Sequence, residues 1–277
     1  MCAAPARRRD VLELYCSRAC YNGGTSSEIE WTKMAIERAD VFPRPHLFTV
    51  EEYFAFEERS EFKHEFIDGV IYDWGDIDPD APAHPDYVPG YAMPHLFTLE
   101  EYLAFEIESE RKHEFIDGII YDMTGGTFNH SRVKVRMTFA LELQLSGSNY
   151  TVCNSDMRVE ISEGRHVYPD LSVVYGAAQL RDDETTLLNP ILVVEALSPT
   201  TADYDRSAKL SYYQSLPSLR CYLIVDQYGV RIDAYTRADG GWHWQSYSSI
   251  DEVIPLDMIG CQLPLSEIYR GIEFSDE

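Results

Sequence analysis

Two acidic residues stand where apolar, strand-like segments begin or end. Glu195 closes the apolar run ILVV in ILVVEALSPT (191–200), and Asp170 follows Pro169 directly before LSVV. An unpaired carboxylate buried in a core is costly and tends to take up a proton. Glu195 therefore requires a cation, a hydrogen-bond network or a route to solvent.

If these two segments are neighbouring strands of one sheet, their carboxylates converge at its end. Two carboxylates with nothing between them repel each other, and one would become protonated. A hard divalent cation removes that conflict, because Mg²⁺ prefers one or two carboxylates together with waters and phosphate oxygens. Such a site suits in-line attack by a metal-activated water on a phosphodiester.

A lysine on a predicted helix follows the two acidic residues along the chain. Pro169-Asp170, Glu195 in VEALSPTT and the D-R-x-x-K sequence ending at Lys209 together resemble the PD-(D/E)xK nuclease superfamily. Within it, the pattern is similar to the Uma-type family of restriction endonucleases, in which the following helix supplies the lysine. The superfamily's usual lysine position, two residues after the glutamate, holds Leu197 here. The resemblance covers residues 95 to 272, including KHEFIDGIIYDM and the helix start at Asn129.

The resemblance implies a metal-dependent endonuclease that hydrolyses DNA phosphodiester bonds and acts as a homodimer. It implies that Asp170 and Glu195 bind Mg²⁺ or Mn²⁺, and that Lys209 orients the attacking water or offsets charge on the phosphate. It further implies that Glu114 is an outer metal ligand and that His130 contacts phosphate or water.

Each residue also has a plainer interpretation when it is taken alone. A Pro-Asp pair is usually a turn, a strand-end glutamate can be ion-paired in a core, and a single lysine is usually solvated. His130 can simply be a hydrogen-bonding residue at a helix start. The functional interpretation therefore depends on the whole set occurring in order.

Two alternatives to an endonuclease stay open. The first is a catalytically degenerate nuclease fold that binds nucleic acid or a protein partner without cleaving, which Leu197 and the net charge of −24 favour. The second is an α/β fold of unrelated role, which would require the motif order to be a coincidence. The retention of Asp170, Glu195 and Lys209 together favours the endonuclease.

Composition limits the kinds of partner. The formal charge of −24 argues against broad nonspecific attraction to nucleic acid or anionic membranes, although a local basic groove remains compatible with it. No apolar run has the length of a membrane span, and the basic N-terminus lacks an apolar signal core. The six cysteines include no CxxC pair, which favours reduced thiols in a cytoplasmic protein.

The first half of the chain contains a duplication. HLFTVEEYFAFEERSEFKHEFIDGVIYD (46–73) recurs as HLFTLEEYLAFEIESERKHEFIDGIIYD (95–122). Each copy predicts a helix capped by Thr49 or Thr98, followed by the segment EFIDG and an apolar strand. Only the second copy leads into a longer domain, so we predict an extension over 1–94, with a partial repeat and a Pro/Asp-rich linker, and a nuclease-like domain over 95–277.

The remaining sequence predicts an α/β fold with a restriction-endonuclease-like core, in which helices flank a central mixed sheet. The expected elements are an amphipathic helix from about Val133, a hairpin formed by 151–161 and 167–176, the buried strand 191–197, one helix over 200–216 and three further strands. Helices must then carry His130 and Lys209 to the strand ends that bear Asp170 and Glu195.

Overall fold

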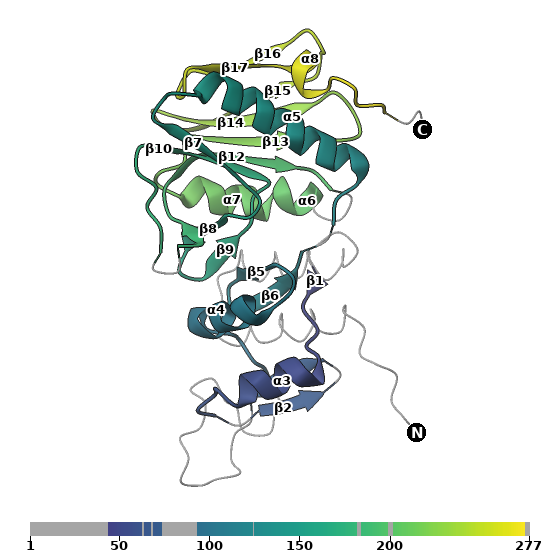
Figure 1. The fold of residues 1–277 in the computed structure, drawn as a ribbon, viewed down its shortest axis with the longest axis vertical. Coiled ribbons are helices and arrows are strands. Elements are labelled where there is room, and N and C mark those ends of the chain that lie inside the picture. Colours follow the sequence, from purple (N-terminus) through teal and green to yellow (C-terminus); the bar gives the residue numbers. More distant parts are fainter. Residues whose placement is uncertain are drawn as a thin grey trace. The chain divides into compact units, whose positions relative to one another are not determined.

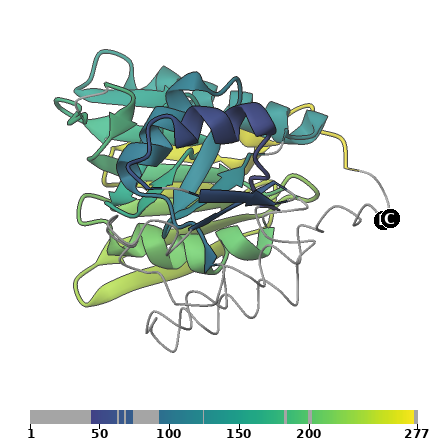
Figure 2. The same ribbon diagram turned by 90° about the horizontal axis from the view of Figure 1, so that it is seen from below.

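The structure is a computed structural model that describes residues 44–62, 64–67, 69–73, 93–123, 125–181, 184–198 and 202–274. Of the extension predicted over 1–94, residues 1–43 and most of the Pro/Asp-rich linker, 74–92, lie outside the described residues. The chain divides into two compact units, with the boundary between Met123 and Thr124. Figures 1 and 2 show the helices and strands of both units.

The first unit holds both copies of the repeat, and each copy folds into a helix and a hairpin. The elements are β1 (Arg44–Pro45), α3 (Val50–Glu57), β2 (His64–Ile67), β3 (Val70–Asp73), β4 (Met93–Pro94), α4 (Leu99–Glu108), β5 (His113–Ile116) and β6 (Ile119–Asp122). Both helices begin with the predicted capping box: Thr49 with Glu52, and Thr98 with Glu101. Because Asp117 and Gly118 both have positive φ, the β5–β6 turn has the backbone twist that a tight hairpin needs.

The two copies share one aromatic core. It contains Phe48, Phe56 and Ile71 from the first copy and Phe97, Tyr102, Phe115 and Ile120 from the second. Phe48 stacks on Phe97 with ring centroids 5.1 Å apart. These contacts join side chains from both sides of the domain boundary that we predict at residue 94. The boundary predicts that residues 95–277 fold without residues 1–94, and a truncated chain tests this.

The second unit is built on a mixed sheet in the order β15-β14-β13-β12-β10-β7. Its strands are β7 (Tyr150–Asn154), β10 (Leu171–Tyr175), β12 (Pro190–Ala196), β13 (Cys221–Val225), β14 (Ile232–Ala238) and β15 (Gly241–Tyr247). β12 is antiparallel to β10 and parallel to β13, so the predicted neighbouring strands are indeed paired. The predicted α/β fold with a central mixed sheet and flanking helices is confirmed.

Helices cover both faces of this sheet (Figure 1). α5 (Phe128–Leu145) packs Val133, Met137 and Leu141 against alternate residues of β10, β12 and β13. α6 (Ala202–Asp205) and α7 (Ala208–Ser215) lie on the other side (Figures 1 and 2). The smaller elements are β8 (Arg158–Ser162), β9 (Arg165–Val167), β11 (Thr186–Leu187), β16 (Val253–Leu256), β17 (Cys261–Pro264) and α8 (Leu265–Ile268).

Two predicted elements are divided in the structure. The single hairpin expected from 151–176 is wrong: β7 pairs with β10, whereas β8 pairs with β9. The amide of Asp156 donates to Asn154 Oδ1 at 2.9 Å, which turns the chain between β7 and β8. Pro169 lies between β9 and β10 and has no N–H to donate to a ladder.

The single helix expected over 200–216 is also wrong. It is split into α6 and α7 at Ser207, whose φ of −125° and ψ of −91° are not helical. The break matters for the site, because α7 starts afresh at Ala208 and carries Lys209 in its first turn.

Candidate functional site

The two strand-end acids lie beside each other on neighbouring strands. Leu171 of β10 is the register partner of Val194 of β12, so Asp170 and Glu195 occupy the next step of the ladder. The side chain of Asp170 accepts a hydrogen bond from the backbone N–H of Ala196, with 2.8 Å between Oδ2 and N. The register therefore places Asp170 and Glu195 at the same end of neighbouring strands.

Asp170 is held by two basic side chains of α5. His130 Nε2 lies 3.3 Å from Oδ2, and Lys134 Nζ lies 2.7 Å from Oδ1. Burial raises the pKa of Asp170, but the hydrogen bond and charge of His130 and the charge of Lys134 outweigh it and lower the pKa to about 2. Asp170 is therefore an ionised acceptor throughout the neutral range.

The start of α5 is fixed, which places His130 and Lys134. Thr127 caps the helix by accepting a hydrogen bond from the backbone N–H of His130. The amide of Asn129 donates to the carbonyl of Glu273 at 2.9 Å. Lys134 Nζ also donates to Ser155 Oγ at 3.1 Å, which holds its stem in place.

Glu195 faces the other side of the sheet, where α7 covers it. Val194 and Ala196 point into the core under α5, so alternation turns Glu195 toward α7. Lys209 Nζ lies 2.8 Å from Glu195 Oε1, and the hydroxyl of Tyr213 donates to the same oxygen at 3.0 Å. Glu195 and Lys209 are buried, with 4% and 5% of their surfaces exposed.

A third acid extends this group. Asp205 of α6 is buried, and its Oδ1 lies 3.9 Å from Lys209 Nζ. Lys209 therefore lies between two carboxylates, Glu195 and Asp205. Buried charges of this kind are tolerated only when they are paired. Because it is buried, Glu195 needs a cationic partner, and Lys209 is that partner in this structure.

The donor set suits a hard divalent cation. Both strand-end residues offer carboxylate oxygens, the ligands that Mg²⁺ and Mn²⁺ prefer. Asp170 is partly accessible, with 14% of its side chain exposed. Lys134 beside Asp170 and Lys209 beside Glu195 supply positive charge that balances the two carboxylates where no ion is bound.

Comparison with known proteins identifies the family of the chain. Residues 99–266 match the model of a family, Uma2, described as "Putative restriction endonuclease". The chain belongs to the Uma2 family. The first copy of the repeat (46–73) precedes the matched residues, whereas α7 and the strand-end acids lie within them.

Relatives with similar sequences share much of the chain. One is "Uncharacterized protein slr1290" of Synechocystis sp. (strain ATCC 27184 / PCC 6803 / Kazusa), 38% identical over 236 residues, which cover 84% of this chain and 96% of the relative. "Uncharacterized protein sll1609" of the same organism is 32% identical over 124 residues, which cover 44% of this chain and 70% of that one.

A solved structure shows the same fold. It is described as a "putative nuclease belonging to DUF820" from Anabaena variabilis ATCC 29413, with a TM-score of 0.54 and 15% sequence identity. The match covers 62% of this chain and 97% of that chain. In the part of this chain that the structure describes, no helix is both long and apolar enough to cross a bilayer.

The second unit thus contains four of the five site residues predicted from the sequence. Asp170 and His130 form one contact group, and Glu195 and Lys209 form another, at adjacent strand ends. Glu114 lies on β5 of the first unit and is buried.

Sequence reasoning missed Lys134 and Tyr213. Both follow a predicted site residue by four positions on the same helix: Lys134 follows His130, and Tyr213 follows Lys209. Residues four apart lie on one helix face, so this spacing was a usable signal. The scarcity of lysine in the chain was a second signal for Lys134.

Proposed function

We propose that this Uma2 protein is a metal-dependent endonuclease that hydrolyses DNA phosphodiester bonds. The observation that carries the proposal is the pair of carboxylates at adjacent strand ends, with Lys209 within 2.8 Å of Glu195. A divalent cation held by Asp170 and Glu195 would acidify a water and neutralise phosphate charge.

The protein's own residues have distinct roles in this proposal. Asp170 is kept ionised and oriented by the Ala196 amide and by Lys134, so it is ready to bind a cation. Tyr213 holds the carboxylate of Glu195 in position. Lys209 places an ammonium group where charge develops on the phosphate oxygens, which is most valuable in a site shielded from water.

Lys209 replaces the lysine that the superfamily usually carries two residues after the glutamate. Leu197 holds that position and is buried, with 2% of its surface exposed. The ammonium arrives from the first turn of α7 and reaches the same carboxylate. We therefore propose that the lysine is relocated and not lost.

The finer parts of the proposal concern His130 and assembly. In this proposal His130 contacts phosphate or water. Two chains act together, because cutting both DNA strands takes two active sites or two events. Sedimentation that gives only the 31.8 kDa monomer across micromolar concentrations would contradict the dimer.

Plasmid cleavage tests the function directly. Purified protein with Mg²⁺ or Mn²⁺ should nick or linearise supercoiled DNA, and EDTA should stop it. Asp170→Asn and Glu195→Gln preserve side-chain shape while weakening ligation, so both should lose cleavage and calorimetric Mn²⁺ binding. Equal Mn²⁺ binding by wild type and Asp170→Asn would contradict the ligand assignment.

The same experiment decides the alternative of a non-cleaving binding protein. Its motivation is the net charge of −24 and the apolar Leu197. If a metal-loaded, folded protein shifts labelled DNA in a gel but never cleaves it, the binding role replaces the endonuclease. If it does neither, a nucleic-acid function is wrong.

A further inference from the structure

The two copies of the repeat exchange their leading segments. β1, which precedes the first copy, pairs with β6 of the second copy, with Arg44 opposite Asp122. β4, which precedes the second copy, pairs with β3 of the first copy, with Asp73 opposite Met93. Each hairpin is therefore completed by the strand that leads into the other copy.

This exchange assembles two equivalent groups of metal-ligating side chains. The first cluster is His64 and Asp73 of the first copy with His95 of the second. The second cluster is His113 and Asp122 of the second copy with His46 of the first. In each cluster the potential ligand atoms lie within 4.8 Å of one another.

An outer carboxylate orients every imidazole. His64 Nδ1 lies 2.9 Å from Glu57 Oε2, and His95 Nε2 lies 3.1 Å from Glu101 Oε2. The second cluster repeats the pattern with Glu106 at 2.9 Å from His113 and Glu52 at 3.2 Å from His46. A carboxylate on one ring nitrogen fixes the tautomer and presents the other nitrogen, as in metal-binding histidines.

The inward-facing nitrogens meet the shared aspartate. His95 Nδ1 lies 2.5 Å from Asp73 Oδ1, whereas His64 Nε2 lies 3.9 Å from the same oxygen. The corresponding distances in the second cluster are 2.7 Å for His46 and 3.8 Å for His113. The longer gap is too wide for a hydrogen bond, and it is close to the roughly 3.4 Å between two ligands of a tetrahedral ion.

His64 gives the second, independent observation. Its side chain is 1% exposed, and among the described residues its Nε2 atom is buried without a hydrogen-bond partner. A buried polar atom without a partner is unfavourable. Because Glu57 holds the opposite nitrogen, the lone pair of Nε2 points toward Asp73 and His95, where a cation would satisfy it.

The negative charge of each cluster also favours a divalent cation. Each cluster combines two imidazoles with three carboxylates, counting the outer glutamates. Asp73 and its two histidines have side chains only 1–2% exposed. In the first cluster a divalent cation would balance negative charge that water does not reach, whereas His46 and Asp122 of the second are 12% and 23% exposed.

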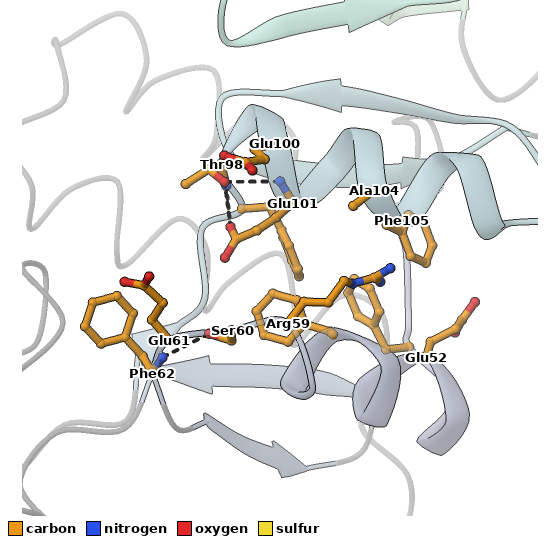
Figure 3. Close-up of a pocket in the computed structure, with 13 residues that line it drawn as sticks. Glu52, Arg59, Ser60, Glu61, Phe62, Thr98, Glu100, Glu101, Ala104 and Phe105 are labelled. Carbon is orange, nitrogen blue, oxygen red and sulfur yellow. Dashed lines mark hydrogen bonds between the residues drawn. The ribbon is translucent and has the colours of Figure 1, made fainter. Parts of the chain in front are cut away.

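We propose that each cluster binds one Zn²⁺-like ion that fastens the two copies together. Imidazole nitrogen and carboxylate oxygen are zinc ligands, whereas Mg²⁺ prefers oxygen alone. Each ion would take two ligands from one copy and one from the other. The outer carboxylates Glu52 and Glu101 also line a cavity of about 310 Å³ between α3 and α4 (Figure 3).

Metal counting tests the proposal. Untagged full-length protein carrying Glu195→Gln, which weakens the sheet site, is stripped with a chelator, dialysed against micromolar Zn²⁺ and analysed for bound metal. Two ions per chain are expected, in line with the two clusters. Asp73→Asn should leave one ion, and Asp73→Asn with Asp122→Asn should leave none. Glu100→Gln, an exposed acid in the first turn of α4, should keep both.

Co²⁺ gives a readout that does not depend on the variants of the clusters. Protein with Glu195→Gln as its single substitution should show the visible absorption of four- or five-coordinate, nitrogen-ligated Co²⁺. Added Zn²⁺ should displace the Co²⁺ and remove that absorption. Zn²⁺ should also raise the melting temperature of this protein. A chain that retains less than one Zn²⁺, or an Asp73→Asn protein that retains both ions, would overturn the proposal. Neither result depends on whether the protein cleaves DNA.

Discussion

Both units of the molecule gather carboxylates around basic side chains, but they use different basic residues. In the sheet site, lysines contact the acids: Lys134 contacts Asp170, and Lys209 contacts Glu195. In the repeat clusters, histidines contact Asp73 and Asp122. A lysine has no lone pair to give while it is protonated, whereas an imidazole can be a ligand itself.

This difference decides what each region can hold. In the proposed sheet site the ligands are carboxylate oxygens, which Mg²⁺ prefers, while Lys134 and Lys209 supply charge and not a lone pair. The clusters offer nitrogen and oxygen together, and their outer glutamates fix the rings. The two proposals follow this difference: a catalytic ion at the sheet site, and ions that join the two copies in the repeat clusters.

The largest effect is expected from removing residues 1–94, which deletes the first copy of the repeat. The second unit has its own core, so a cooperative melt should remain. The second copy loses Phe48 and Phe56 from the shared aromatic core and loses β1 from the edge of β6. We expect the truncated chain to self-associate about tenfold or more tightly than the full chain by sedimentation velocity.

Deletion of residues 1–43 alone is the matched control, because it keeps both copies of the repeat. That protein should sediment like the full chain. A truncated chain from residue 95 that is insoluble or melts without cooperativity would show that the first copy is integral to the whole fold, and the predicted boundary at 94 would be wrong.

Lys209→Met tests whether the lysine of the sheet site is catalytic. We expect plasmid cleavage to fall by about 10²–10³-fold, as for the loss of one donor to transition-state charge. Mn²⁺ binding should remain, because the ammonium is not a ligand. Lys209→Arg should restore little, since a planar guanidinium is a different donor.

Ser211→Ala, at an exposed position of the same helix, should cleave at the wild-type rate. If Lys209→Met cuts plasmid at the wild-type rate under saturating Mg²⁺, the relocated-lysine idea is wrong. Glu195 would then be better interpreted as a structural acid.

Tyr213→Phe removes a hydrogen bond to a buried charge without changing the ring. Tyr213 is fully buried, and its hydroxyl donates to Glu195 Oε1 at 3.0 Å. The free energy of unfolding should fall by about 1.5–3 kcal/mol in urea titration. A change below about 0.5 kcal/mol would place this side chain among neutral substitutions and leave Lys209 as the main partner of Glu195.

Lys134→Met should have the smallest effect, and in the opposite direction. Removing the ammonium 2.7 Å from Asp170 removes a charge that competes with a divalent ion. We expect Mn²⁺ to bind several-fold more tightly by calorimetry, because Lys134 is partly exposed and its charge is screened. Weaker Mn²⁺ binding would mean that Lys134 mainly positions Asp170.

The pH dependence of Asp170 follows the same contacts. Its folded pKa of about 2 is below the usual value for an unfolded chain, so its contribution to stability is full at neutral pH and is lost as the pH falls through about 2. Without Lys134, the pKa should rise and the loss should occur at higher pH in acid-unfolding titrations.

The sequence by itself determined the strand-end acids, the helix-borne Lys209 and the two capping boxes. These are local signals: an acid that ends an apolar run, a lysine at a set helical spacing, and a threonine followed three residues later by glutamate. Each signal depends on side-chain chemistry and short-range geometry, which do not change with the rest of the fold.

Only the tertiary structure decided how the two copies combine. Two nearly identical segments can each close on themselves or exchange leading strands, and the local contacts are the same in both cases. In the structure β1 pairs with the second copy and β4 pairs with the first. The stacking of Phe48 on Phe97 in the shared core accompanies this exchange. Because that choice depends on long-range packing, the partners of His46 and His95 could not be inferred from the sequence alone.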